Sequence, residues 1–210
     1  KSFFNTLITL GNEEDNASKG HYRYGHHNRY SKHHLLPIGE FVPFGDLLRP
    51  LAPLFNLPMS SFARGDYQQE NLIAKGTHIL PLICFEIAFA DQLAKNLTDK
   101  TQLLLTVSND AWFADSHGPH QHMEIARMRA LEFARPLVRA TNTGITAAVD
   151  HHGKFINQLP QFEEGVLISE IAFVTGNTPY SLYGNKIIYT IALLFALLII
   201  VFAKTRCRSL

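Results

Sequence analysis

Short apolar runs alternate with polar loops and two helix-like segments over the first 180 residues. Clusters of β-branched and large apolar residues predict strands at 3–10, 30–36, 77–84, 103–107, 137–140, 145–149, 155–159 and 166–171. Helices are predicted at 87–96 and 124–134, the second packing through Ile125, Met128, Leu131 and Phe133. Strands and helices mixed in this order predict a layered α/β domain over 1–180.

Two interruptions in this pattern predict irregular backbone. Residues 41–65 are apolar but contain four prolines, which excludes a regular helix or a central strand. We expect this segment to be a partly exposed arm that can touch lipid. Pro81, within the strand predicted at 77–84, argues for an edge or a bulge there, and 150–154 (DHHGK) predicts a hairpin turn.

The C-terminal apolar run predicts a membrane span. Residues 187–203 contain no charge, proline or glycine, and they lack the polar stripe that a buried amphipathic helix usually shows. Lys204, Arg206 and Arg208 follow at once. By the positive-inside rule, we expect the tail 204–210 to be cytoplasmic and the preceding domain to lie outside.

Composition supports a folded domain. Hydrophobic residues make up 46% of the 210 positions and charged residues 18%, which excludes global disorder. The net charge of +1 gives no electrostatic case for nucleic acid binding. Two cysteines far apart, Cys84 and Cys207, exclude a disulfide framework. Because Lys1 opens the chain without an export signal, we expect a C-terminal part of a longer protein.

Eleven histidines raise the question of a metal site. His117, His120 and His122 lie close to Glu124, and zinc accepts such ligands. The spacing His-x-x-His-x-His is not a usual zinc signature, however, so we predict surface or pocket-lining histidines and no metal.

Candidate chemistry lies where predicted strands end. Cys84 ends an apolar run, and Glu86 follows where a helix is expected to begin, an environment that favours a thiolate. The alternative is an inert buried cysteine. Lys32 ends another strand and could stabilise an oxyanion, held by Glu40, although most lysines are solvated surface charges.

A third polar group follows the strand predicted at 103–107. Asn109 lies beside Trp112, the only tryptophan of the chain, and the pair could form one wall of a substrate pocket. Turn formation alone would also explain the polar residues here.

Four segments resemble the carbon–nitrogen hydrolase (nitrilase) superfamily: YSKHHLLPIGEFVP, ICFE, TVSNDAWF and ARMRALEFARPLVRATNTGIT. Their order and the trailing apolar run are most similar to its membrane-bound acyltransferase branch. The resemblance implies an α-β-β-α sandwich, incomplete at its N-terminus, followed by one transmembrane helix. It implies Cys84 and Lys32 as catalytic residues of a Glu-Lys-Cys triad, supported by Glu40, Glu86 and the Phe85 backbone.

The resemblance also implies a reaction and its partners. A phospholipid acyl chain would pass through a Cys84 thioester to the α-amino group of the N-terminal diacylglyceryl-cysteine of an apolipoprotein. No cofactor is implied, and we expect a monomer in the bacterial inner membrane with a periplasmic catalytic domain. The base glutamate is expected upstream of Lys1. Alternatives are a tethered amidase or nitrilase-type hydrolase and a non-catalytic domain that binds lipids or partners.

Overall fold

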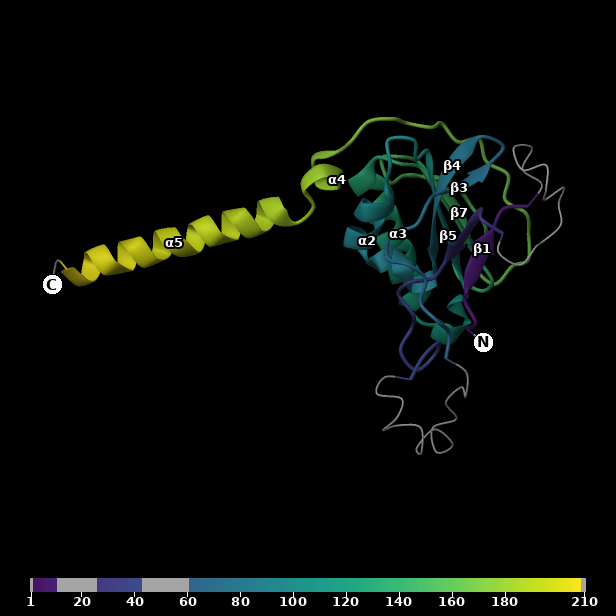
Figure 1. Cartoon of the computed structure of the whole chain (residues 1–210), viewed down its shortest axis with the longest axis horizontal. Coiled ribbons are helices and arrows are strands. Elements are labelled where there is room, and N and C mark those ends of the chain that lie inside the picture. The colour runs from purple at the N-terminus through teal and green to yellow at the C-terminus, as the bar shows by residue number, and fades with distance from the viewer. Residues whose placement is uncertain (1, 11–25, 43–60, 209–210) are drawn as a thin grey trace.

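A six-stranded mixed sheet forms the centre of the domain (Figure 1). The computed structural model describes residues 2–10, 26–42 and 61–208, with the backbone alone for 201–208. The strands lie side by side in chain order: β3 (Leu72–Ala74), β4 (Thr77–Ile83), β5 (Leu103–Ser108), β6 (Leu137–Thr141), β7 (Ala147–Val149) and β8 (Phe155–Gln158). Strands β4, β5 and β6 are parallel, and the other neighbours are antiparallel. Three parallel strands therefore have their carboxyl ends at one edge of the sheet.

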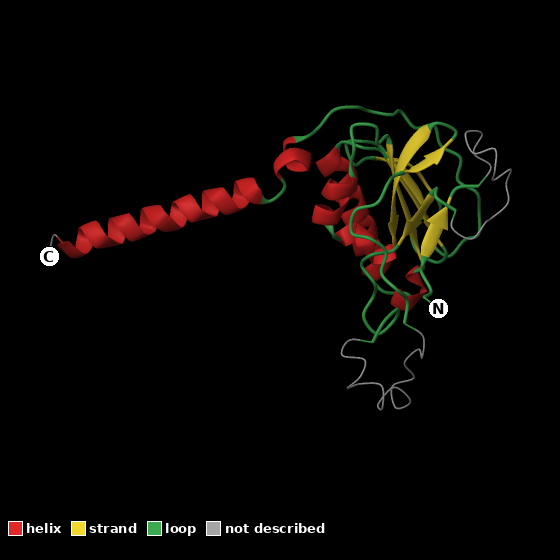
Figure 2. Cartoon of the chain, in the orientation of Figure 1, coloured by secondary structure: helices red, strands yellow, loops and turns green. Residues whose placement is uncertain are grey.

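Helices connect these parallel strands and lie together beside the sheet (Figure 2). The connection from β4 to β5 holds η2 (Cys84–Ala88) and α2 (Ala90–Asn96), and that from β5 to β6 holds η3 (Asp110–Phe113) and α3 (Gly118–Phe133). The main core fills the space between helices and sheet, and it includes Leu80, Leu82, Leu93, Leu104, Met123 and Phe133. Burial of these apolar side chains is the main force that holds the helices on the sheet.

A two-stranded antiparallel sheet of β1 (Thr6–Ile8) and β2 (Arg29–Ser31) is the third layer. A second core cluster of Tyr30, Leu72 and Ile83 joins it to the larger sheet. The described residues thus form a helix–sheet–sheet arrangement. This matches three of the four layers in the predicted sandwich.

Several predicted elements need correction. Residues 166–171 form no strand, and α3 begins at Gly118, with Pro119 in its first turn, where a loop was expected. Met128 and Leu131 are 47% and 48% exposed, because α3 packs on the sheet through Met123, Ala126, Ala130 and Phe133. Small alanine side chains let the helix approach closely. The sequence pattern, weighted toward large residues, was right for Ile125 and Phe133, which pack at the core, and wrong for Met128 and Leu131.

The structure agrees with the predictions for Pro81 and for the turn at 150–154. Strand β3 pairs only with Thr77–Ile79, so at Pro81 strand β4 has β5 alone as a neighbour and the missing N–H breaks no ladder bond to β3. The turn at 150–154 joins β7 and β8, with Gly153 at a φ of +75°. Of the predicted apolar arm, residues 43–60 lie outside the described part of the chain.

The chain ends in a short helix, α4 (Pro179–Tyr183), and a long helix, α5 (Lys186–Arg208), that extends away from the sheet (Figure 1). Tyr180 of α4 packs its ring against Phe133 at 5.6 Å. Among the residues that the structure describes, no helix combines the length and apolar character needed to cross a membrane, so the predicted transmembrane helix at 187–203 is not confirmed.

Candidate active site

The carboxyl ends of β4, β5 and β6 surround a cavity of about 650 Å³. Cys84 follows β4, Asn109 follows β5 and Asn142 follows β6, because the three parallel strands are in register. Lys32 and Glu40 reach the same cavity from the loop after β2, and its lining is completed by Asn5, Leu36, Ile83, Val107, Ser108, Trp112, Ala140 and Thr141. The structure thus brings together the cysteine, lysine and one glutamate that the sequence singled out. A volume of this size is in the usual range for a small-molecule site.

Cys84 has a backbone conformation that few non-glycine residues adopt. Its φ is +57°, in the left-handed region, at the junction between β4 and η2. Such a conformation costs an L-residue roughly 1–2 kcal/mol, so the surrounding structure must hold it. The side chain is partly exposed. A cysteine on a tight strand-to-helix turn, facing a cavity, is well placed to act as a nucleophile.

Glu86 joins this turn to the loop that carries Lys32. Its carboxylate is fully buried and accepts hydrogen bonds from the backbone N–H of Ile83 at 2.9 Å and of His33 at 2.7 Å. The His34 N–H and the Tyr30 hydroxyl add two more, at 3.2 and 3.1 Å. Burial raises the pKa of Glu86, and these hydrogen bonds oppose that rise. Glu86 therefore bonds to the backbone just before Cys84 and to the backbone of the loop that carries Lys32.

Lys32 forms a short ion pair with Glu40. The Lys32 Nζ donates to Glu40 Oε2 at 2.6 Å, and the lysine side chain is only 1% exposed. Asn5 Nδ2 and the Leu36 N–H, each at 2.8 Å, also donate to Glu40. Burial alone would raise the pKa of Glu40, but the hydrogen bonds from Lys32, Leu36 and Asn5 outweigh it and hold the pKa below its usual value. The pair therefore presents a fixed ammonium group at the wall of the cavity.

The remaining predicted site residues lie around these groups. Trp112 is 72% exposed and lines the cavity from η3. Asn109 accepts a turn hydrogen bond from the Ala111 N–H at 3.1 Å. It also accepts one from Asn142 Nδ2 at 2.6 Å, which joins the segments that follow β5 and β6. Phe85 follows Cys84, and its ring meets Phe89 edge to face at 4.9 Å. Their roles toward a substrate stay predictions.

A buried charged cluster beneath the cavity was not predicted. Arg139 Nη2 donates to Asp110 Oδ2 at 2.7 Å, and neither side chain is exposed. His122 lies against both and contacts the Cys84 carbonyl. An arginine inside the short apolar strand at 137–140 is a signal of a buried partner, but the sequence does not say which residue that partner is.

The histidine-rich segment separates in the structure. His122 is buried, whereas His117 and His120 are exposed. Within the described residues, no three or more His, Cys, Asp or Glu side chains are grouped so that they could hold a metal ion.

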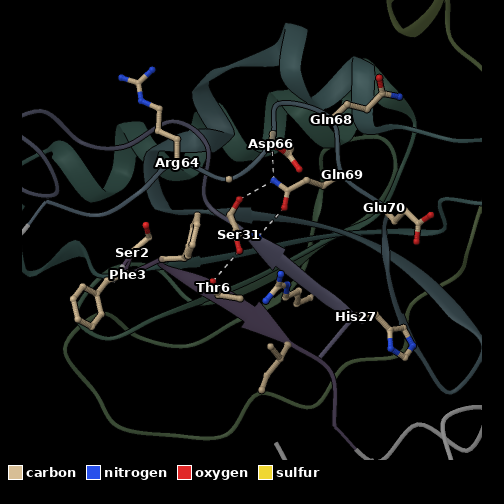
Figure 3. A pocket seen from close by; sticks show the side chains of 14 residues that line it. Ser2, Phe3, Thr6, His27, Ser31, Arg64, Asp66, Gln68, Gln69 and Glu70 are labelled. Carbon is tan, nitrogen blue, oxygen red and sulfur yellow. Dashed lines mark hydrogen bonds between the residues drawn. The ribbon is translucent and has the colours of Figure 1, made fainter. Parts of the chain in front are cut away.

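A larger hollow, of about 800 Å³, lies beside β1 and β2 (Figure 3). Figure 3 shows Ser31 between Thr6 and Gln69, and Ser31 and Thr6 are joined through their hydroxyls at 3.0 Å. The described residues that line this hollow include no cysteine and no buried ammonium group. Size alone therefore does not locate the chemistry, and the smaller cavity at Cys84 is the candidate active site.

The fold and this arrangement define a class of protein. The profile of the carbon–nitrogen hydrolase family matches residues 1–179, and the chain belongs to that family. Two solved structures share the fold. The carbon–nitrogen hydrolase from Helicobacter pylori G27 has a TM-score of 0.54 at 15% identity, covering 80% of this chain and 56% of that one. The NitFhit protein of C. elegans has a TM-score of 0.50 at 20% identity, covering 75% and 35%.

Several curated proteins that resemble this chain share one name. The chain is 59% identical over 187 residues to the apolipoprotein N-acyltransferase of Photobacterium profundum, and 58% identical over 189 residues to that of Shewanella oneidensis. These alignments cover 89% and 88% of this chain but only 35% and 36% of the relatives. The chain therefore spans about a third of the length of the proteins it matches.

Proposed function

We propose that this chain carries the catalytic cysteine of an apolipoprotein N-acyltransferase, in a nitrilase-like domain spanning 1–180. The observation that carries the proposal is the single cavity shared by Cys84 and the Lys32–Glu40 pair. The Cys84 thiolate attacks the ester carbonyl of a phospholipid acyl chain, and the lysophospholipid leaves as an alcohol. The acyl chain is then held as a thioester on Cys84.

Lys32 and the Phe85 backbone N–H stabilise the oxyanion of the tetrahedral intermediate. Lys32 suits this role because burial limits its movement and Glu40 fixes its position, so little reorganisation accompanies the reaction. Phe85 is the second residue of η2 and directly follows the nucleophile. Loss of one preorganised donor of this kind costs about 10²–10³-fold in rate.

The thiol proton needs an acceptor. Among the described residues that line the cavity, Glu40 is the only carboxylate, and it is already bonded to Lys32 at 2.6 Å. We therefore assign the general base to a second carboxylate outside the described residues. In the second half-reaction, the free α-amino group of a diacylglyceryl-cysteine attacks the thioester. An amide forms and the Cys84 thiolate is regenerated.

We also propose that α5 lies in the membrane and anchors the domain. Large apolar side chains of α5 are exposed on all sides, among them Ile188, Leu194, Phe195 and Ile199, and water is a poor solvent for such a surface. The basic residues Lys204, Arg206 and Arg208 follow the apolar run and favour a cytoplasmic C-terminus. This arrangement places the cavity on the periplasmic side of the inner membrane, where both lipid substrates lie.

A labelled-lipid experiment tests the catalytic proposal. The full-length protein is incubated with a phospholipid that carries an alkyne-tagged acyl chain, and tagged protein is assayed before and after hydroxylamine. We expect a hydroxylamine-sensitive label at Cys84 that is absent in Cys84→Ala. A diacylglyceryl-cysteinyl peptide should discharge the label, and its N-acetylated counterpart should not. Label that persists in Cys84→Ala would refute the assignment.

A vesicle-binding experiment tests the anchor. Leu194→Asp combined with Leu198→Asp should lower partition of the protein into phospholipid vesicles by at least tenfold, since each charge is costly in hydrocarbon. The matched control is Val166→Asp with Ile168→Asp, which changes two exposed apolar side chains outside α5. Equal partition of the two double variants would refute the anchoring role.

A further inference from the structure

Three buried side chains form a chain of contacts that ends on the peptide group after Cys84. Arg139 Nη2 lies 2.7 Å from Asp110 Oδ2 and 2.9 Å from His122 Nδ1. His122 Nε2 lies 3.2 Å from the carbonyl oxygen of Cys84. The chain of contacts therefore runs from β6 through α3 to the turn that holds the nucleophile.

The carbonyl partner of His122 fixes one ring proton. The Cys84 carbonyl oxygen can only accept, so His122 Nε2 donates the hydrogen bond between them at 3.2 Å. On the other side of the ring, Nδ1 lies 2.9 Å from Arg139 Nη2 and 3.2 Å from Asp110 Oδ1. Both members of the buried ion pair therefore hold the imidazole in place.

The surroundings hold this arrangement in place. Asp110 accepts a hydrogen bond from the Ser108 hydroxyl at 2.6 Å, and its own N–H donates to Asn142 Oδ1 at 3.0 Å. The absence of a side chain at Gly144 makes room for Asp110, since a Cβ there would overlap the Asp110 carboxylate. Burial alone would raise the pKa of Asp110, but its polar contacts with His122 and Ser108 and the charge of Arg139 bring the pKa to about 2. Asp110 is thus an anion near neutral pH.

The Cys84 carbonyl and the Phe85 N–H belong to one planar peptide group. That group is trans, so its N–H points away from the side on which His122 binds. A hydrogen bond to the oxygen of an amide polarises the group and strengthens its N–H as a donor. The same bond fixes the plane of the peptide at a residue whose φ of +57° would otherwise be unfavourable.

The geometry points to His122 as a positioning residue for the oxyanion donor. Held by Arg139 and Asp110, it orients and polarises the Cys84–Phe85 peptide group so that the Phe85 N–H faces the developing oxyanion. This inference rests on the proposed acyl transfer at Cys84. It predicts that loss of His122 slows the reactions of Cys84 that form an oxyanion, while the thiol keeps its rate in reactions that form none.

Two reactions of the same cysteine separate these effects. Acylation of Cys84 by an activated ester such as p-nitrophenyl butyrate passes through an oxyanion, whereas alkylation by iodoacetamide does not. In the full-length protein, His122→Leu should lower the ratio of acylation to alkylation about tenfold. This is less than the 10²–10³-fold effect of removing a direct oxyanion donor. His122→Gln retains an N–H near the Nε2 position and should recover part of the ratio.

His26 supplies the matched control. It is also buried, and its Nε2 lies 2.7 Å from the carbonyl of Thr9, far from Cys84 in the sequence and outside the cavity lining. His26→Leu should leave the ratio unchanged. If His122→Leu changes acylation and alkylation equally, or if His122→Gln behaves like His122→Leu, His122 is merely structural and the inference is wrong. A wild-type protein that alkylates but does not acylate would instead refute the proposed acyl transfer itself.

Discussion

Replacement of Glu86 by glutamine keeps the shape of the side chain and removes its charge. The carboxylate accepts four hydrogen bonds, one through Oε2 from the Ile83 N–H and three through Oε1. An amide can place its oxygen toward only one of these sets. We expect it to face the three donors, so that the amide N–H₂ group meets the Ile83 N–H and two buried donors point at each other.

The cost follows from these contacts. Losing one charge-assisted hydrogen bond costs about 1.5–3 kcal/mol, and leaving a buried donor unpaired adds roughly 1–3 kcal/mol. Removing the buried charge offsets part of this loss in unfolding free energy, since burial of a charge is itself unfavourable. The net loss in unfolding free energy for Glu86→Gln should therefore be about 2–4 kcal/mol.

Denaturant unfolding followed by circular dichroism in mild detergent measures this loss. Glu124→Gln is the matched control, because Glu124 is a 61%-exposed carboxylate paired with Arg127, and exposed pairs contribute about 1 kcal/mol or less. The acylation rate of Cys84 should fall by more than the folded fraction, since the loops bearing Lys32 and Cys84 are no longer joined. A Glu86→Gln protein within 0.5 kcal/mol of wild type, a margin typical of surface changes, would refute the reasoning.

Three further outcomes are expected. Lys32→Met should lower acylation of Cys84 by about 10²–10³-fold while iodoacetamide alkylation changes far less; parallel losses in the two rates would argue against an oxyanion role. Glu40 has a folded-state pKa below its usual 4.5, so its stabilisation is present above that pH and is lost as the pH falls. The difference in unfolding free energy between wild type and Glu40→Gln should thus shrink from pH 6 to about pH 3, and a constant difference would contradict this. Ala134→Gly should raise the unfolding free energy by about 0.5–1 kcal/mol, because Ala134 ends α3 at a φ of 46° and a ψ of 49°; a lower denaturation midpoint would exclude this account.

Local sequence was enough to predict the residues at strand ends. Cys84 and Asn109 end buried strands, and the parallel sheet then brings them to one edge without further information. Lys32 and Glu40 were recognisable because their motif resembles a known family. Glu40 lies close to Lys32 in the sequence, and the order of the parallel strands makes Cys84 and Asn109 neighbours.

The buried cluster could not be predicted in the same way. Asp110, His122 and Arg139 come from η3, α3 and β6, and their contacts depend on how far α3 turns and slides on the sheet. The same uncertainty explains why Met128 and Leu131 were wrongly expected to pack at the core, since the alanines that do so, Ala126 and Ala130, do not stand out in a hydrophobic pattern. A rotation of α3 by one residue position would separate His122 from Cys84, and only tertiary packing determines the rotation that α3 adopts.

The left-handed backbone at Cys84 implies a trade-off between stability and reactivity. Comparing Cys84→Gly with Cys84→Ala removes the thiol in both proteins and relieves the φ of +57° in only one. Glycine gains roughly 1–2 kcal/mol from the relaxed backbone and loses about 0.5–1 kcal/mol in chain entropy, so the glycine protein should be the more stable. The most stable residue at position 84 would therefore abolish the proposed chemistry. Under the proposed function, selection for the thiol rather than for stability would explain a cysteine at this turn.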